Sequence, residues 1–375
     1  MYWSNHRRAY LGLISSGALM LYMALVPAAN VAAEPGPAAS GIKSAEESET
    51  KEERTRTRRP TARARAAARR AAREAAANEK KEEERRKWLA RLEARGVEAW
   101  PEQESDDEHA AALAKSRELV EEVITLFPGT QLYETEHFLF TSDMPGEQVE
   151  PYIASLDKMY GWMCQLYGVK PGQKVWFGGK APIIAFVEKS DFDAFEERFF
   201  PDARQSLGSV ANIYGLCHLS KNGEVLISCY RGNDPSDFGQ MLVHETSHGF
   251  VHRYKTKASL PNWVDEGMAD LVGAEIVPTS RAVHNRELKA VQQLAGQKSL
   301  GGMLAAERIQ AWQYGLASNL NRFLLQASRD NYVRFIEALK EGMKWEEALR
   351  EAYGSTPEEM LFHYSRWIGV ADLRP

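Results

Sequence analysis

Two histidines with a glutamate between them are the residues of this sequence that are best placed to do chemistry. His244, Glu245 and His248 read His-Glu-x-x-His within Val243–Phe250. On a helix, residues four apart share one face with Cβ atoms about 5–6 Å apart, so both imidazoles can reach one metal ion. Glu245 lies about 100° round the helix from His244, within reach of a water molecule on that ion. The spacing predicts a zinc site whose own helix carries a general base.

A catalytic zinc ion takes three protein ligands, so the two histidines need a partner from elsewhere. One known pattern adds a glycine at position 251 and a histidine at position 254, but the sequence has Val251 and Tyr254 there. His252 lies one turn beyond His248, and a ligand set that included it would extend over about 12 Å of helix rise. We therefore expect His252 to be a surface or core histidine.

A glutamate from a following helix is the other way to complete the site. Pro261 suits a helix start, and Glu266 falls within the helix that would follow. Gly267 has no Cβ and would let this helix approach its neighbour closely. Asp270 shares a face with Glu266 and could hold the free nitrogen of a liganding histidine. Asp265 points about 100° away and is the weaker ligand candidate.

These two elements together resemble the gluzincin metallopeptidases, the thermolysin-like group, and most of all their small branches in exported bacterial proteins. The motifs are His244-Glu245-x-x-His248 and Trp263-x-x-Glu266-Gly267-x-Ala269-Asp270, with a looser likeness over residues 135–367. The resemblance implies one zinc ion bound by His244, His248 and Glu266. It also implies that Glu245 is the general base and that Asp270 orients a histidine.

The same resemblance implies that the chain is a peptidase, and it also implies how the chain folds. It implies an α+β, zincin-like domain with a mostly antiparallel sheet lobe, a helical lobe, and the zinc helix between them. An edge strand, placed at Glu224–Cys229, would pair with an extended peptide substrate. A Tyr or His of the helical lobe would stabilise the oxyanion. Tyr314, in a segment that resembles the helix after the site, is the first choice, with His284 and Tyr230 as alternatives.

The order of the expected elements agrees with an α+β chain, because strands come first and helices second. We expect helices over 106–127, 150–166 with Pro151 in the first turn, 191–199 with an Asp cap, 238–254 and 262–275. We expect strands at 138–141, 175–177 and 183–187, and a hairpin of 213–219 with 224–230. Asn222-Gly223 marks its turn. Cys217 and Cys229 flank that turn, so a disulfide is one alternative and buried free thiols are the other.

The first 33 residues have the pattern of an export signal. A basic segment precedes the apolar run of residues 10–26, and Val31-Ala32-Ala33 offers a cleavage point. An uncleaved run would instead anchor the chain in a membrane. In both cases we expect residues 101–375, the predicted metallopeptidase domain, outside the cytoplasm, either in the periplasm or secreted.

Residues 34–100 are of low complexity and are predicted to be a disordered or helical spacer. Between Arg54 and Arg73 there are nine arginines and no acidic residue, although the whole chain has a net charge of −5. This tract could contact an anionic membrane or cell-wall polymer, while nucleic acid is not expected for an exported chain. Besides a peptidase acting on peptides or proteins, the sequence therefore leaves a second reading open. In that reading the chain is an inactive peptidase-fold protein that binds the cell envelope through its arginines.

Overall fold

The computed structural model describes residues 62–101, 104–201, 213–232 and 234–375. The predicted export signal and the tract before Ala62 lie outside these residues. The chain divides into two compact units, residues 1–83 and Glu84–Pro375. Helix α1 (Ala62–Ala94) begins in the first unit and ends in the second. None of the helices in the described part of the chain is long and apolar enough to cross a membrane.

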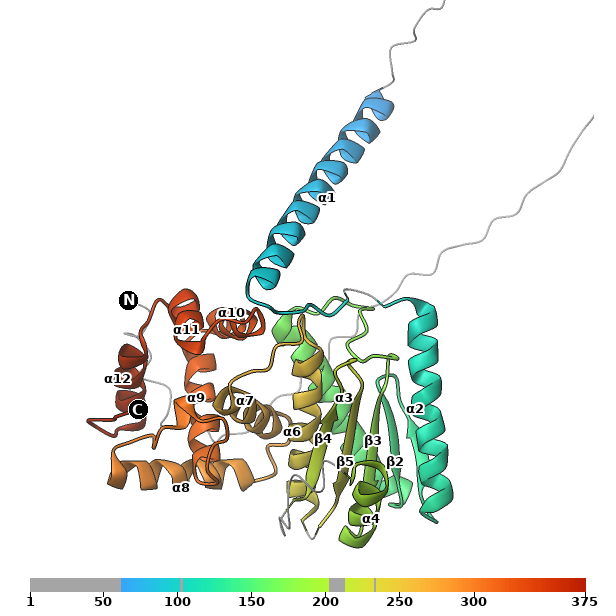
Figure 1. The fold of residues 1–375 in the computed structure, drawn as a ribbon, viewed down its shortest axis with the longest axis vertical. Helices are drawn as coiled ribbons and strands as arrows, with labels where there is room; N and C mark the ends of the chain where they lie inside the picture. Colours follow the sequence, from blue (N-terminus) through green and yellow to red (C-terminus); the bar gives the residue numbers. More distant parts are fainter. Residues whose placement is uncertain (1–61, 102–103, 202–212, 233) are drawn as a thin grey trace, which may run out of the picture. The chain divides into compact units, whose positions relative to one another are not determined.

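The second unit is built on a five-stranded sheet with the order β1-β2-β3-β5-β4 (Figure 1). The strands are β1 (Gln131–Glu134), β2 (Phe138–Ser142), β3 (Ala181–Phe186), β4 (Gly215–Leu219) and β5 (Val225–Tyr230). Strands β2, β3 and β5 are parallel, and β1 and β4 pair antiparallel with their neighbours. The sheet is mixed, so the prediction of a mostly antiparallel sheet is wrong. Helix α3 (Gly146–Tyr167) joins β2 to β3, and a helical crossover of this kind brings the chain back parallel.

At the end of the sheet formed by the β4–β5 hairpin, the edge strand is β4. The predicted edge, Glu224–Cys229, falls instead in β5, which lies between β3 and β4 and is buried along its whole length. This correction agrees with the composition of β5, since a strand with neighbours on both sides and both faces covered reads as a continuous apolar run. The hairpin itself is confirmed, and Gly223 takes a φ of +90° in its turn. Cys217 and Cys229 are free thiols.

Helices cover both faces of the sheet. On one face, Leu139, Ile184 and Phe186 pack in a core cluster with α2 (Asp106–Leu126) and α4 (Lys189–Phe199). On the other face, Phe138 packs against Tyr160 of α3 and against Trp176. Successive residues along a strand point to opposite faces of the sheet. The two helical layers therefore contact alternate side chains of each strand.

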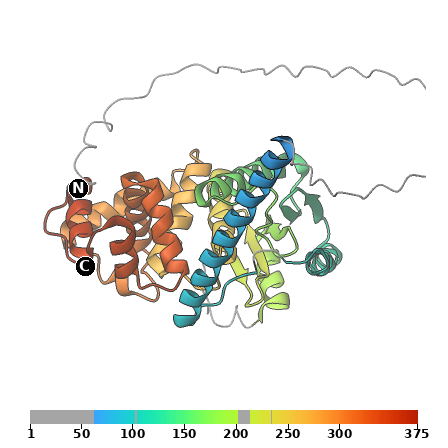
Figure 2. The same cartoon turned by 90° about the horizontal axis from the view of Figure 1, so that it is seen from above.

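A helical lobe follows the sheet in the chain. It consists of α7 (Asn262–Ile276), α8 (Ala282–Gln297), the short 3-10 helix η1 (Met303–Ala305), α9 (Gln313–Ala327), α10 (Arg329–Lys340), α11 (Trp345–Tyr353) and α12 (Pro357–Ile368). Helix α6 (Pro235–Arg253) lies between the sheet and this lobe, as both views show (Figures 1 and 2). The α+β arrangement expected from the order of elements is therefore present.

Three local predictions are wrong. Residues 175–177 are not a strand, because Trp176 enters the core while Gly178 and Gly179, both at positive φ, turn the chain. Helix α3 starts after Pro145, so Pro151 lies inside the helix and not in its first turn. Helix α4 starts after Glu188, without a side-chain cap from Asp191.

The second unit begins before residue 101. Leu92, in the last turns of α1, is 1% exposed, and Trp100 is 7% exposed. The indole of Trp100 donates a hydrogen bond to the His252 carbonyl at 2.7 Å. Residues 84–100, predicted to be part of a spacer, thus contribute buried side chains to the same unit as the sheet.

Candidate metal centre

Helix α6 holds the His-Glu-x-x-His motif in its interior. Asp234 caps the helix by accepting hydrogen bonds from the backbone N–H groups of Ser236 and Asp237, and Pro235 occupies the first position, where its missing N–H costs little. Gly249 allows the helix to lie close to the sheet, since a Cβ there would be 2.5 Å from Val225 Cγ1. The helix therefore presents the motif at the boundary between the sheet and the helical lobe.

Three side-chain atoms converge in front of α6. The Nε2 atoms of His244 and His248 are 3.2 Å apart. Glu266 Oε2, from α7, is 3.4 Å from His244 Nε2 and 3.7 Å from His248 Nε2. Ligands about 2.0–2.1 Å from a tetrahedral zinc ion lie roughly 3.3 Å from one another. These three groups could hold a metal ion, and their separations match the geometry of a tetrahedral one.

Each histidine has an aspartate of α7 at its other ring nitrogen. His244 Nδ1 is 2.9 Å from Asp270 Oδ1, and the same oxygen accepts a hydrogen bond from Arg286 Nη2 at 2.6 Å. His248 Nδ1 forms an ion-pair contact with Asp265 Oδ1 at 3.2 Å. Such carboxylates fix the ring orientation and leave Nε2 for a metal. Asp270 is the residue predicted for this role from its spacing, whereas Asp265 is predicted only as a weaker ligand candidate.

The charges round the two rings favour a cation between them. Burial lowers the pKa of His244, but its contacts with Asp270 and Glu266 outweigh this and raise the pKa well above its usual value. For His248, burial also lowers the pKa, and the charge of Asp265 raises it to about 9. A group of carboxylates this close to two imidazoles attracts a proton or a metal ion. The donor set and the charge balance both fit a divalent metal.

Glu245 faces the edge strand beside these groups. It is half-buried, and its carboxylate has no hydrogen-bond or ion-pair partner within the described residues. Gly215 of β4 makes room for its stem, because a Cβ there would be 3.1 Å from Glu245 Cγ. Burial raises the pKa of Cys217 well above its usual value, and the charge of Glu245 raises it further. The stem of Glu245 therefore lies against the edge strand β4.

Tyr314, the first choice for the oxyanion donor, lies in the first turn of α9. Burial raises its pKa to about 12, and the carboxylates of Glu266, Asp270 and Glu245 contribute to the rise. Its hydroxyl is thus in the electrostatic field of the metal centre. Helix α9 comes close to α7 at Gly267, where a Cβ would be 2.3 Å from the Ala317 carbonyl oxygen.

The other candidates from the sequence are placed differently. His284 is exposed on α8. Tyr230 packs against Phe192 of α4, in the core cluster on the face that α2 and α4 cover. His252 donates a hydrogen bond from Nε2 to the Ser220 carbonyl at 3.1 Å and contacts Trp100 edge-on. The structure thus gives His252 the structural position expected for it.

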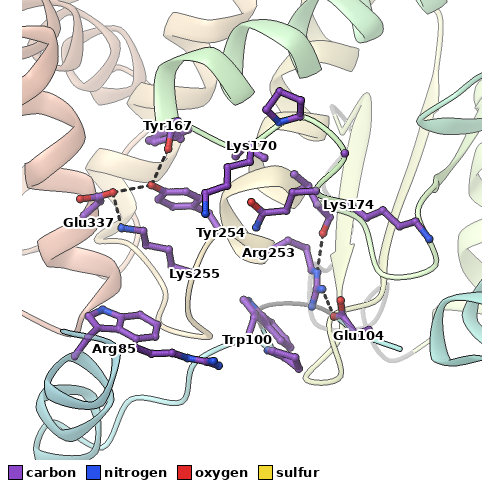
Figure 3. Close-up of a pocket in the computed structure, with 18 of the residues that line it drawn as sticks. Arg85, Trp100, Glu104, Tyr167, Lys170, Lys174, Arg253, Tyr254, Lys255 and Glu337 are labelled. Carbon is purple, nitrogen blue, oxygen red and sulfur yellow. Dashed lines mark hydrogen bonds and ion pairs between the residues drawn. The ribbon is translucent and has the colours of Figure 1, made fainter. Parts of the chain in front are cut away.

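A cavity of about 1150 Å³ lies at the C-terminal end of α6 (Figure 3). None of the metal-centre residues lines it. Arg253 contributes to its wall, donating from Nε to the Val175 carbonyl at 3.1 Å and pairing with Glu104. The Arg253 guanidinium also lies over Trp100, 4.5 Å from the ring centre. These contacts hold the C-terminal end of α6 against Trp100 and Glu104.

Comparison with known proteins adds no family assignment. No family model matches the sequence, and no curated protein matches it either. The resemblance to gluzincins therefore rests on the sequence motifs alone.

Proposed function

We propose that this chain is an exported zinc-dependent peptidase of the gluzincin type, which hydrolyses peptide bonds with Glu245 as general base. The observation that carries the proposal is the convergence of two imidazole nitrogens and one carboxylate oxygen, 3.2 to 3.7 Å apart. Glu245 lies beside this convergence on the same helix as the histidines.

Two nitrogen donors and one oxygen donor suit zinc with an open fourth position. His244, His248 and Glu266 would hold the ion. When bound, zinc polarises a substrate carbonyl and lowers the pKa of a coordinated water molecule. Asp265 and Asp270 keep the two rings turned so that their Nε2 atoms face Glu266.

The remaining steps belong to the side chains of this protein. Glu245 accepts the proton of the attacking water and later passes it to the leaving amine. Tyr314 stays protonated at neutral pH, since its pKa is raised to about 12. It can therefore donate a hydrogen bond to the carbonyl oxygen as negative charge develops there.

The substrate would lie along β4 as an added strand. This strand is the sheet edge on the side of α6, and its residues are partly exposed. Main-chain hydrogen bonds to such an edge hold an extended peptide without regard to most of its side chains. Gly215 of β4 lies against Glu245, so a peptide on this edge would pass the general base.

The test is peptide cleavage by the Glu245→Gln variant, with zinc content measured on the same sample. The variant keeps the three ligands, so zinc content should match that of the unmodified chain. Cleavage of a fluorogenic peptide library should fall about 10²- to 10⁴-fold, the usual contribution of general base catalysis. Undiminished cleavage by a zinc-loaded variant would refute the role of Glu245. A zinc-loaded unmodified chain that cleaves no peptide would favour the inactive, envelope-binding alternative.

A further inference from the structure

The first 12 residues of α1 carry their positive charge on one side. Five arginines precede Glu74, the first acidic residue of the helix, namely Arg63, Arg65, Arg69, Arg70 and Arg73. At about 100° per residue, all five fall within an arc of about 160°. Ala71 and Ala75 lie on the opposite side. Arg69, Arg70 and Arg73 also border one shallow groove along the helix. We call these five side chains the arginine face.

The arginine face is not neutralised by the rest of the described chain. All five residues are exposed. Among them only Arg70 forms an ion pair within the described residues, with Glu74 at 2.9 Å, and both partners are exposed to solvent. The face therefore presents its charge to solvent.

The charges on this face also oppose one another. Arg69 lies four residues from both Arg65 and Arg73, and like charges at this spacing destabilise a helix. Arg63 and Arg65 lie in the first turn, where the helix dipole is already positive and no acidic residue offsets them. A partner with dense negative charge would relieve both effects, so binding would also stabilise the helix.

We propose that the arginine face binds an anionic phospholipid surface. Guanidinium groups pair with phosphate through two parallel hydrogen bonds, which makes phosphate the natural counterpart. A charge confined to one side of a helix fits a flat surface, whereas a helix in a nucleic-acid groove has phosphates on both sides. Opposite the arginine face the helix carries Ala71 and Ala75, which have only methyl groups, so this part of the helix would lie on the headgroups by charge and not by insertion. This proposal is independent of the metal centre.

The test is binding of the full-length chain to phosphatidylcholine vesicles with and without phosphatidylglycerol, by co-sedimentation. An arginine near an anionic surface strengthens binding about fivefold. Replacing all five by Gln should therefore weaken binding to the anionic vesicles by about a thousandfold or more. Circular dichroism of the variant checks that the rest of the chain stays folded.

A second variant keeps the charge and composition but breaks the face. Exchanging Arg69 with Ala71 and Arg73 with Ala75 moves two arginines to the opposite side (Arg69→Ala, Ala71→Arg, Arg73→Ala, Ala75→Arg). Binding should fall about 20- to 30-fold, as for the loss of two contacts.

Three results would overturn the proposal. The first is equal binding by the exchange variant and the unmodified chain, which would mean that charge alone matters. The second is equal binding to neutral and anionic vesicles, which would assign attachment to another segment, such as the apolar run at residues 10–26. The third is tighter binding to duplex nucleic acid than to anionic vesicles at the same ionic strength, which would make nucleic acid the partner.

Discussion

Replacing Gly267 with alanine should loosen the contact between the helix that carries Glu266 and the helix that carries Tyr314. A Cβ on residue 267 would be 2.3 Å from the Ala317 carbonyl oxygen and 2.3 Å from Asn321 Nδ2. A comfortable carbon–oxygen contact is about 3.3 Å or longer, so α7 and α9 would have to separate by about 1 Å. The obstacle is backbone within a packed helix, and it cannot move aside as a side-chain end could.

The size of the effect follows from two opposing contributions. Overpacking of this kind costs about 1–3 kcal/mol, and the upper part of that range applies to a clash with backbone. Alanine is favoured over glycine inside a helix by about 1 kcal/mol. The free energy of unfolding should therefore fall by about 2 kcal/mol. Zinc tolerates ligand displacements of only about 0.2 Å, so a shift of Glu266 should also weaken zinc binding at least tenfold.

Gly161 is a matched control for this substitution. It lies inside α3, is exposed, and a Cβ there would meet nothing within 4 Å. Gly161→Ala should raise the free energy of unfolding by about 0.5–1 kcal/mol and leave zinc binding unchanged. Urea denaturation and zinc titration of both variants measure these effects. If Gly267→Ala were as stable as Gly161→Ala and bound zinc as tightly as the unmodified chain, the close approach of α7 and α9 would not matter as argued.

Replacing Asp265 or Asp270 by Asn should weaken zinc binding about 10- to 100-fold, because each holds a histidine ring; unchanged affinity in a zinc titration of both variants would contradict that role. Burial lowers the pKa of Lys340 to about 7, from its ordinary value of 10.5. Between pH 7 and 10.5 the unfolded chain therefore binds more protons than the folded chain. The free energy of unfolding should then rise by about 2 kcal/mol more between pH 7 and 9 in the unmodified chain than in Lys340→Met. Identical pH slopes in denaturation experiments would refute the burial argument. Trp100→Ala should lower the free energy of unfolding by about 3–5 kcal/mol, whereas Leu89→Ala, at a site 40% exposed, should change it by less than about 0.5 kcal/mol. An equally small change for both variants in urea denaturation would show that residues 84–100 do not belong to the folded unit.

The convergence of His244, His248 and Glu266 could be predicted because the sequence information for it is local. His244 and His248 share a face of one helix, and Glu266 follows on the next, so a spacing rule is enough to bring them together. The contact between Asp265 and His248 was missed because it depends on a side-chain rotamer across two helices. The position of Asp265 directly before Glu266 was the one signal that could have suggested it.

The sheet was harder to predict because its strand directions depend on pairing between distant segments. The β4–β5 hairpin has a local turn signal at Asn222-Gly223 and was predicted correctly. The parallel pairing of β2, β3 and β5 leaves no such signal, and neither does the choice of β4 as the edge. The buried role of Trp100 was missed for a related reason, because its partners, Arg253 and the His252 carbonyl, lie far away in the chain.

The proposed metal centre is tested most directly by a calorimetric titration of the metal-stripped full-length chain with zinc. We expect one zinc ion per chain, with binding greatly weakened in Glu266→Gln and in the variant with both His244 and His248 replaced by alanine. Glu245→Gln should bind zinc as tightly as the unmodified chain, since it keeps all three ligands. Equal zinc binding by the unmodified chain and the double histidine variant would contradict the proposed metal centre.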